Sequence, residues 1–193
     1  PTFSSNGSHI YYLKVDGSST RASLYQIPKI GGEEKRLVTD ISIQDSKRNF
    51  SLSPDGKQVS FIRLDEGFNR SLVITDLDGN NIRTLTSRRL PNFLTGAAWS
   101  PDGKSVVTYA RKFGGKADPE VNNGLISVST EDLSERPLTQ KQWKDFVGMA
   151  WLPDMSGLIV SASEERPGLL QLWHISVPGG DVSRVTNDLS DYA

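Results

Sequence analysis

The sequence predicts an all-β fold built from four copies of one small antiparallel unit, and three observations lead to that prediction. The motif Ser-Pro-Asp-Gly occurs at residues 53–56 and 100–103, and degraded copies lie at 4–7 and 152–155. The Asp or Asn positions of the four copies are 49, 47 and 52 residues apart. A large apolar residue precedes each copy, and alternating apolar residues follow it. A period of about 50 residues is typical of architectures that repeat one structural unit.

The first two strands of each unit are predicted on either side of the motif. The first strand ends on a large apolar residue: Phe3, Leu52, Trp99 and Trp151. The second strand carries an aliphatic residue four positions after the Asp or Asn: Ile10, Val59, Val106 and Leu158. Two residues later, the period-2 alternation of a half-buried strand continues with Tyr12, Phe61, Thr108 and Val160.

Two further strands complete each unit. The third opens on a leucine: Leu24, Leu72, Leu125 and Leu172. The fourth closes on an aliphatic-Thr pair at 38–39, 85–86, 138–139 and 185–186. Four short strands joined by turns form one blade of a β-propeller, so the predicted fold is a β-propeller of four-stranded antiparallel blades, with about four blades present. The approximate repeats are 1–48, 49–96, 97–147 and 148–193.

Turn chemistry supports this division. Pro54 and Pro101 preset the first corner of the hairpin, and Gly56 and Gly103 can adopt positive φ without Cβ strain. In the fourth repeat Met155 replaces this glycine, and we expect residues 156–157 (Ser-Gly) to supply the flexible corner instead.

The chain resembles the TolB-type β-propeller repeats, a WD-like family whose mark is a strand ending in aromatic-Ser-Pro-Asp-Gly-Lys; residues 98–104 match it. Residues 171–176, 178–180 and 185–192 are similar to propellers attached to acidobacterial receptor-like Ser/Thr kinases and winged-helix regulators. The resemblance implies a non-catalytic sensor or protein-interaction module in a larger bacterial signalling protein. It also implies an extracytoplasmic, periplasmic position.

Composition excludes several partners. The chain of 193 residues carries 22 basic and 23 acidic side chains, so no net field attracts nucleic acid. It has no cysteine and therefore no disulfide or thiolate zinc site. No run approaches the roughly 20 apolar residues that span a bilayer, so we expect no direct membrane insertion.

The ends of the sequence suggest an excised piece of a longer protein, because it lacks an initiator Met and stops at residues 192–193, where a fifth copy would begin. Propellers bury their blade faces by closing a ring of about four to eight blades. We therefore expect either a closed four-bladed ring or a homo-oligomer whose copies complete the propeller.

The candidate binding surface lies on the face that carries the long, irregular connections. Binding residues concentrate on such loops, and arginine with aromatic residues is the composition of protein-binding hot spots. The predicted partner is a protein or a cell-envelope ligand. The candidate residues are Arg48, Arg88, Arg89, Phe93, Lys141, Trp143 and Lys144. The alternative is that the basic side chains solvate the loops and the aromatic ones cap the blade edges.

Catalysis has little support in the sequence. The two histidines, His9 and His174, fall in different repeats, and no nucleophile elbow, zinc motif or phosphate loop is present. We expect no enzyme activity, no cofactor and no metal, with residues 76–80 forming a hairpin turn. The cluster of Asn187 with the acidic residues Asp188 and Asp191 is expected to make local turn hydrogen bonds, and Trp99, Trp151 and Trp173 are expected to pack between or within blades.

Two alternative functions stay open. The chain could be the propeller that gates a prolyl-oligopeptidase-like or tricorn-like peptidase, since such enzymes carry similar repeats. It could also be a carbohydrate-binding or carbohydrate-active propeller that uses carboxylates around the channel.

Overall fold

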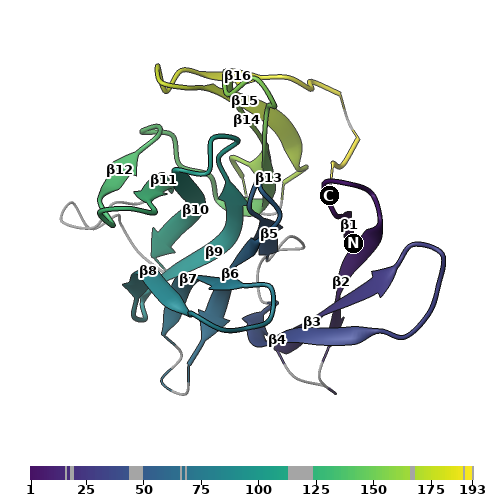
Figure 1. The fold of residues 1–193 in the computed structure, drawn as a ribbon. Helices are drawn as coiled ribbons and strands as arrows, with labels where there is room; N and C mark the ends of the chain where they lie inside the picture. The colour runs from purple at the N-terminus through teal and green to yellow at the C-terminus, as the bar shows by residue number, and fades with distance from the viewer. Residues whose placement is uncertain are drawn as a thin grey trace.

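The computed structural model describes residues 1–15, 17, 20–43, 50–65, 67, 69–112, 124–165, 168–188 and 190–192. Within these residues every regular element is a β-strand, and the strands form four antiparallel units arranged as an arc (Figure 1). The predicted all-β fold of four-stranded blades is confirmed.

Each repeat contributes four strands that pair in sequence order. Blade 1 contains β1 (Thr2–Phe3), β2 (His9–Val15), β3 (Arg21–Pro28) and β4 (Lys35–Ser42). Blade 2 contains β5 (Phe50–Leu52), β6 (Gln58–Leu64), β7 (Arg70–Asp76) and β8 (Arg83–Arg88). Blade 3 contains β9 (Asn92–Trp99), β10 (Ser105–Lys112), β11 (Gly124–Ser129) and β12 (Glu135–Pro137). Blade 4 contains β13 (Asp145–Trp151), β14 (Gly157–Ser163), β15 (Gln171–Ser176) and β16 (Val182–Arg184).

One pairing crosses a blade boundary. Ile41 in β4 pairs with Arg63 in β6, which joins the first two blades into one eight-stranded sheet. Blades 3 and 4 are separate four-stranded sheets.

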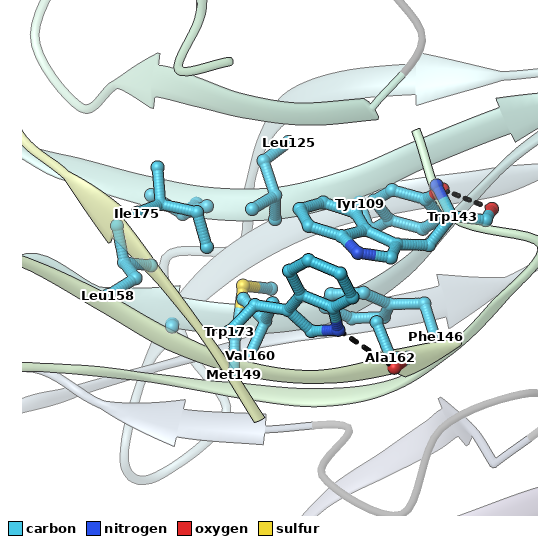
Figure 2. Packing of buried hydrophobic residues seen from close by; sticks show 12 residues of the cluster. Tyr109, Leu125, Trp143, Phe146, Met149, Leu158, Val160, Ala162, Trp173 and Ile175 are labelled. Carbon is cyan, nitrogen blue, oxygen red and sulfur yellow. Dashed lines mark hydrogen bonds between the residues drawn. The ribbon is translucent and has the colours of Figure 1, made fainter. Parts of the chain in front are cut away.

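Three hydrophobic clusters hold neighbouring blades together. The first lies between blades 1 and 2 and includes Leu24 and Phe61; the second lies between blades 2 and 3 and includes Leu72 and Trp99. The third joins blades 3 and 4 and centres on buried aromatic side chains that include Trp173 (Figure 2), with Trp151 packed against it. The predicted packing role of the three tryptophans Trp99, Trp151 and Trp173 is therefore confirmed.

The motif closes its hairpin through a small hydrogen-bond network. The Ser100 hydroxyl donates to Asp102 Oδ1 (2.6 Å) and accepts from the Ser105 backbone nitrogen (3.0 Å), while the Lys104 nitrogen donates to the same carboxylate (3.0 Å). Ser53 and Asp55 repeat this arrangement in blade 2. Because these hydrogen bonds favour the charged carboxylate, they lower the pKa of Asp55 and Asp102.

The fourth turn departs from the expectation. Met155 itself adopts the left-handed conformation, with φ of 63°, close to the 72° of Gly103. The prediction that residues 156–157 would supply the flexible corner is therefore wrong. The Met155 nitrogen donates to the Leu152 carbonyl (3.1 Å), so the hairpin closes as in the other repeats and holds a non-glycine residue at the strained position.

Candidate functional site

The candidate surface lies where β9 and β13 begin. These are equivalent first strands of adjacent blades and pack against each other. The residues just before them, 88–91 and 141–144, therefore lie on the same face of the arc, which we call the loop face. Arg48, also predicted for this surface, lies outside the described residues.

Arg88 joins two blades. Its guanidinium forms a bidentate pair with Glu135 of β12 through Nη2–Oε2 (2.6 Å) and Nη1–Oε1 (3.0 Å), and it also donates to Thr86 Oγ1 (2.9 Å). The side chains of Arg88 and Glu135 are 15% and 22% exposed. Arg88 therefore connects blade 2 to blade 3, and a ligand that used this side chain would compete with Glu135.

Lys141 is also engaged within the protein. Its ammonium pairs with Glu164 and lies 5.2 Å from the centre of the Trp173 ring. With about a third of its side chain exposed, it can still present charge at the surface.

Trp143 belongs to the core between blades 3 and 4. It is 4% exposed, and its ring packs near Tyr109 (6.3 Å between centroids) and Trp173 (6.2 Å), as Figure 2 shows. The Tyr109 hydroxyl donates to the Trp143 carbonyl (2.7 Å) and accepts from the Trp143 nitrogen (3.0 Å). Burial raises the pKa of Tyr109, which keeps this hydroxyl protonated as a donor.

Phe93 is likewise interior, at 2% exposed. The guanidinium carbons of Arg70 and Arg111 lie 4.7 and 4.6 Å from the centre of its ring. The aromatic members of the predicted surface thus pack inside the protein, so the loop face offers cationic rather than aromatic contacts.

Two of the predicted residues are exposed. Arg89 and Lys144 project from the segments that lead into β9 and β13. Arg111 Nη1 donates to the Lys144 carbonyl (3.3 Å), which places a third cation beside Lys144. The binding role of Arg89 and Lys144 stays a prediction.

Sequence reasoning missed Arg70 and Arg111. Both stand near strand ends that border long connections, Arg70 as the first residue of β7 and Arg111 just before the end of β10. Their position near strand ends on the loop face is the sequence signal that could have identified them. Their shared contact with Phe93 depends on the fold and has no signal in the sequence.

The remaining polar groups make local contacts. Asp188 accepts from the Tyr192 hydroxyl (2.7 Å) and the Ser190 nitrogen (2.9 Å), which together lower its pKa, and Asp191 accepts from the Leu170 nitrogen (2.9 Å). In the predicted hairpin at 76–80, Asp78 accepts from the Asn80 nitrogen (3.0 Å). Within the described part of the chain, no group of three or more His, Cys, Asp or Glu residues could hold a metal ion, and no helix could cross a bilayer.

Two curated bacterial proteins are similar in sequence. The uncharacterized peptidase YuxL of Bacillus subtilis is 29% identical over 193 aligned residues, covering 90% of this chain and 25% of that protein. An uncharacterized protein of Agrobacterium fabrum is 26% identical over 164 residues, covering 85% of this chain and 52% of that protein. The chain thus spans between a quarter and about half of these relatives. No family model matches the chain.

Solved structures resemble the whole arc. A structure assigned as TolB from Agrobacterium tumefaciens superposes with a TM-score of 0.69 and 22% identity, covering 97% of this chain and 61% of that one. The chain has a TolB-like β-propeller fold. This TolB-like arc also matches a puromycin-hydrolyzing peptidase of Mycobacterium tuberculosis (TM-score 0.67, 15% identity, 100% and 31% of the two chains). A manganese-bound oligogalacturonate lyase superposes with a TM-score of 0.61 and 17% identity, covering 96% of this chain and 52% of that one.

Proposed function

We propose that this TolB-like arc is a non-catalytic interaction module whose loop face binds an acidic segment of a protein partner. The observation that carries the proposal is that Arg89 and Lys144 lie just before β9 and β13, the first strands of two adjacent blades, with Arg111 near the end of β10 bonded to the Lys144 carbonyl. Arg89 and Lys144 are exposed, and rigid strands position them. Cationic groups on loops held by a rigid scaffold favour fast, salt-sensitive association with anionic partners.

The module would act as the sensory part of a larger bacterial signalling protein. The resemblance of the repeats to TolB-type propellers supports this role and an extracytoplasmic, periplasmic position. In this proposal the ligand occupies the loop face, and the domain that carries the output lies elsewhere in the parent protein.

Charge reversal tests the binding surface. We expect the double variant Arg89→Glu/Lys144→Glu to weaken binding of a fluorescent ten-residue glutamate peptide at least tenfold, with little change in the melting temperature. The matched control reverses two exposed lysines of the Pro-Asp-Gly turns, Lys57→Glu/Lys104→Glu, at the opposite ends of the strands. Equal losses in both double variants would show that only net charge matters and would reject the proposed surface.

A second candidate is the propeller of a peptidase. Similarity to YuxL along 90% of this chain favours it, as does the match to the puromycin-hydrolyzing peptidase. A hydrolase domain encoded in the same gene would support this candidate, whereas a kinase or DNA-binding domain would contradict it.

A third candidate, a carbohydrate-binding or carbohydrate-active propeller, draws on the fold shared with oligogalacturonate lyase. Oligogalacturonate is an anionic chain and can be tested directly on the same face. Competition with the glutamate peptide would extend the ligand class to acidic sugars, and shortening of the oligosaccharide over time would indicate catalysis.

A further inference from the structure

The turn between β1 and β2 holds an amide where the corresponding turns of the other three blades hold a carboxylate. Asn6 occupies the position of Asp55, Asp102 and Asp154 in the repeat, and all four side chains are exposed. Blades 2 and 3 have a neighbour on each side and still expose this position. The exposure of Asn6 is therefore a property of the turn.

Three hydrogen-bond donors converge on Oδ1 of Asn6. The Ser4 hydroxyl donates at 2.8 Å, the Ser8 backbone nitrogen at 3.0 Å and the Ser8 hydroxyl at 2.6 Å. In the other blades, Asp102 and Asp154 each accept from one hydroxyl and one backbone nitrogen. The oxygen of Asn6 thus receives the same kinds of donor as these carboxylates, and one more of them.

The amide nitrogen of the same side chain is not used in this way. Among the described residues, Asn6 Nδ2 makes no hydrogen bond, so a carboxylate oxygen in its place would lose no contact. Hydrogen bonds to an ionised acceptor are also stronger than those to a neutral one. The equivalent donors lower the pKa of Asp102 and Asp154, which shows that this type of turn favours the charged carboxylate. The turn of blade 1 would therefore hold aspartate better than asparagine.

Asn6 is also followed by a glycine, whose backbone nitrogen is the internal nucleophile that converts asparagine to aspartate. Gly7 has φ of 65°, and a Cβ added to it would meet no atom within 4 Å, so no side chain hinders this nitrogen. Attack on Cγ of Asn6 places negative charge on Oδ1. The donors from Ser4 and Ser8 are already aimed at that oxygen and would stabilise the charge as it develops.

We propose that Asn6 is a site of spontaneous deamidation and that the folded turn directs the product to aspartate. The Gly7 nitrogen bonds to Cγ of Asn6 and loses its proton to solvent. The Cγ–Nδ2 bond breaks, and Nδ2 takes a proton from solvent and leaves as ammonia. Water then opens the cyclic succinimide. Opening at Cγ gives aspartate, whereas opening at the main-chain carbonyl carbon gives isoaspartate, so the net reaction consumes one water and releases one ammonia.

The folded turn favours the first of these two openings. The donors from Ser4 and Ser8 polarise the carbonyl at Cγ, which makes that carbon the better target for water. Isoaspartate would also lengthen the main chain by one carbon within the turn that the Gly7 nitrogen closes on the Ser4 carbonyl (2.8 Å). Only aspartate keeps this bond and gives blade 1 the carboxylate-centred turn of the other blades. This modification is independent of ligand binding at the loop face.

Peptide mapping by mass spectrometry tests the proposal after the folded chain has been kept at neutral pH and physiological temperature for several weeks. We expect the mass gain of an amide-to-acid change at Asn6, and electron-transfer fragmentation should show more aspartate than isoaspartate. The chain unfolded in urea should react faster, because Gly7 is released from Ser4, and its isoaspartate share should be several-fold higher. Asn80 and Asn81 are equally exposed but precede larger residues, so they should remain unchanged. Asn123, also followed by glycine, lies outside the described residues and falls on a separate peptide.

Two variants test the role of the turn. Asn6→Gln should show no mass gain at this position, because its longer side chain forms the corresponding ring far more slowly. Ser4→Ala/Ser8→Ala should raise the isoaspartate share toward that of the unfolded chain, with a melting curve to confirm that the variant is folded. If Asn6 stays intact in the folded chain while the unfolded chain reacts, the proposed site is overturned. Equal isoaspartate shares in the folded and unfolded chains would overturn the directing role of the turn.

The stability of the product is measured separately. Asn6→Asp reproduces the deamidated chain and should raise the melting temperature by about 2–4 °C, the shift expected of about 1 kcal/mol in a chain of this size. The matched reverse change, Asp102→Asn, places an amide in the turn of blade 3 and should lower it by a similar amount. A melting temperature of Asn6→Asp at or below that of the wild type would contradict a turn suited to a carboxylate.

Discussion

The Tyr109 hydroxyl holds both backbone groups of Trp143, donating to its carbonyl at 2.7 Å and accepting from its nitrogen at 3.0 Å. Tyr109 lies on β10 of blade 3, and Trp143 lies in the connection that leads into blade 4. One buried side chain therefore fixes where the next blade begins.

We expect Tyr109→Phe to lower the free energy of unfolding by about 1–3 kcal/mol, because two buried backbone groups would lose their partner. The stacking on Phe146, at 4.4 Å between ring centroids, would remain in the variant. Urea unfolding measures the difference, and Tyr25→Phe on a half-buried blade face serves as the control. Equal stability of Tyr109→Phe and the wild type would show that water replaces the hydroxyl without cost.

The fourth turn offers a stabilising change. Met155 holds φ at 63° and is 36% exposed, so a glycine there would relieve backbone strain and lose little packing. We expect Met155→Gly to raise the free energy of unfolding by about 1 kcal/mol.

The reverse change at an equivalent site is the control for this turn. Gly103 has φ of 72°, and the nearest atom to an added Cβ would be 3.9 Å away, so Gly103→Ala introduces strain without a clash. Gly103→Ala should lower the free energy of unfolding by about the same 1 kcal/mol. Destabilisation by Met155→Gly would mean that contacts of the methionine side chain outweigh the strain.

The repeats predicted the blades because their signals are local. Ser100, Asp102 and Gly103 are close in the sequence, and their spacing alone specifies the turn. The pairing of Arg88 with Glu135 joins residues 47 positions apart, so it depends on how two blades pack and has no local signature. Trp143 was predicted to lie on the binding surface, and that prediction failed for a related reason. The residue lies in a connection, but the neighbouring blade buries it.

The same lesson applies to Met155. The repeat pattern predicts glycine at this corner of the turn, and we therefore expected the corner to shift to residues 156–157. The structure keeps the corner at Met155 because the flanking strands β13 and β14 remain in register, with Trp151 opposite Leu158. The strand pairing therefore determines the turn, and the residue tolerates the conformation.

Acid should weaken a second turn, between β11 and β12. Hydrogen bonds from Ser129 and Ser134 lower the pKa of Asp132 to about 2, against about 3.9 for an unperturbed aspartate. The folded state thus binds this proton more weakly than the unfolded state. The stabilising contribution is fully present above about pH 4 and is lost as the pH falls through about 2.

An NMR titration of the Asp132 carboxyl carbon should therefore give a midpoint near 2. Ser134→Ala removes a hydroxyl donor (2.8 Å to Oδ1) and should move the midpoint upward. Urea midpoints between pH 4.5 and 2 should fall less steeply for Asp132→Asn than for the wild type. The control Glu131→Gln makes the same change in charge next to the turn. A midpoint near 3.9 in the wild type would contradict the hydrogen-bonded geometry.

Substitutions in the pair of Arg88 and Glu135 distinguish a structural role of Arg88 from a binding role on the loop face. Removing one partner of a mostly buried ion pair strongly destabilises the folded protein, because the other charge is left buried without compensation. We expect Arg88→Gln and Glu135→Gln each to destabilise the fold, and the double variant to lose less than the sum of the two. The coupling energy in this double-mutant cycle should be about 1 kcal/mol or more.

The more exposed pair of Lys141 and Glu164 gives the comparison. Its side chains are 33% and 45% exposed, so its coupling should be below about 1 kcal/mol. If the Arg88 cycle showed no coupling while Arg88→Gln reduced binding of the glutamate peptide, Arg88 would serve the ligand rather than the fold. If the coupling is present, Arg88 joins blades 2 and 3, and the cationic contact for a partner depends on Arg89 and Lys144.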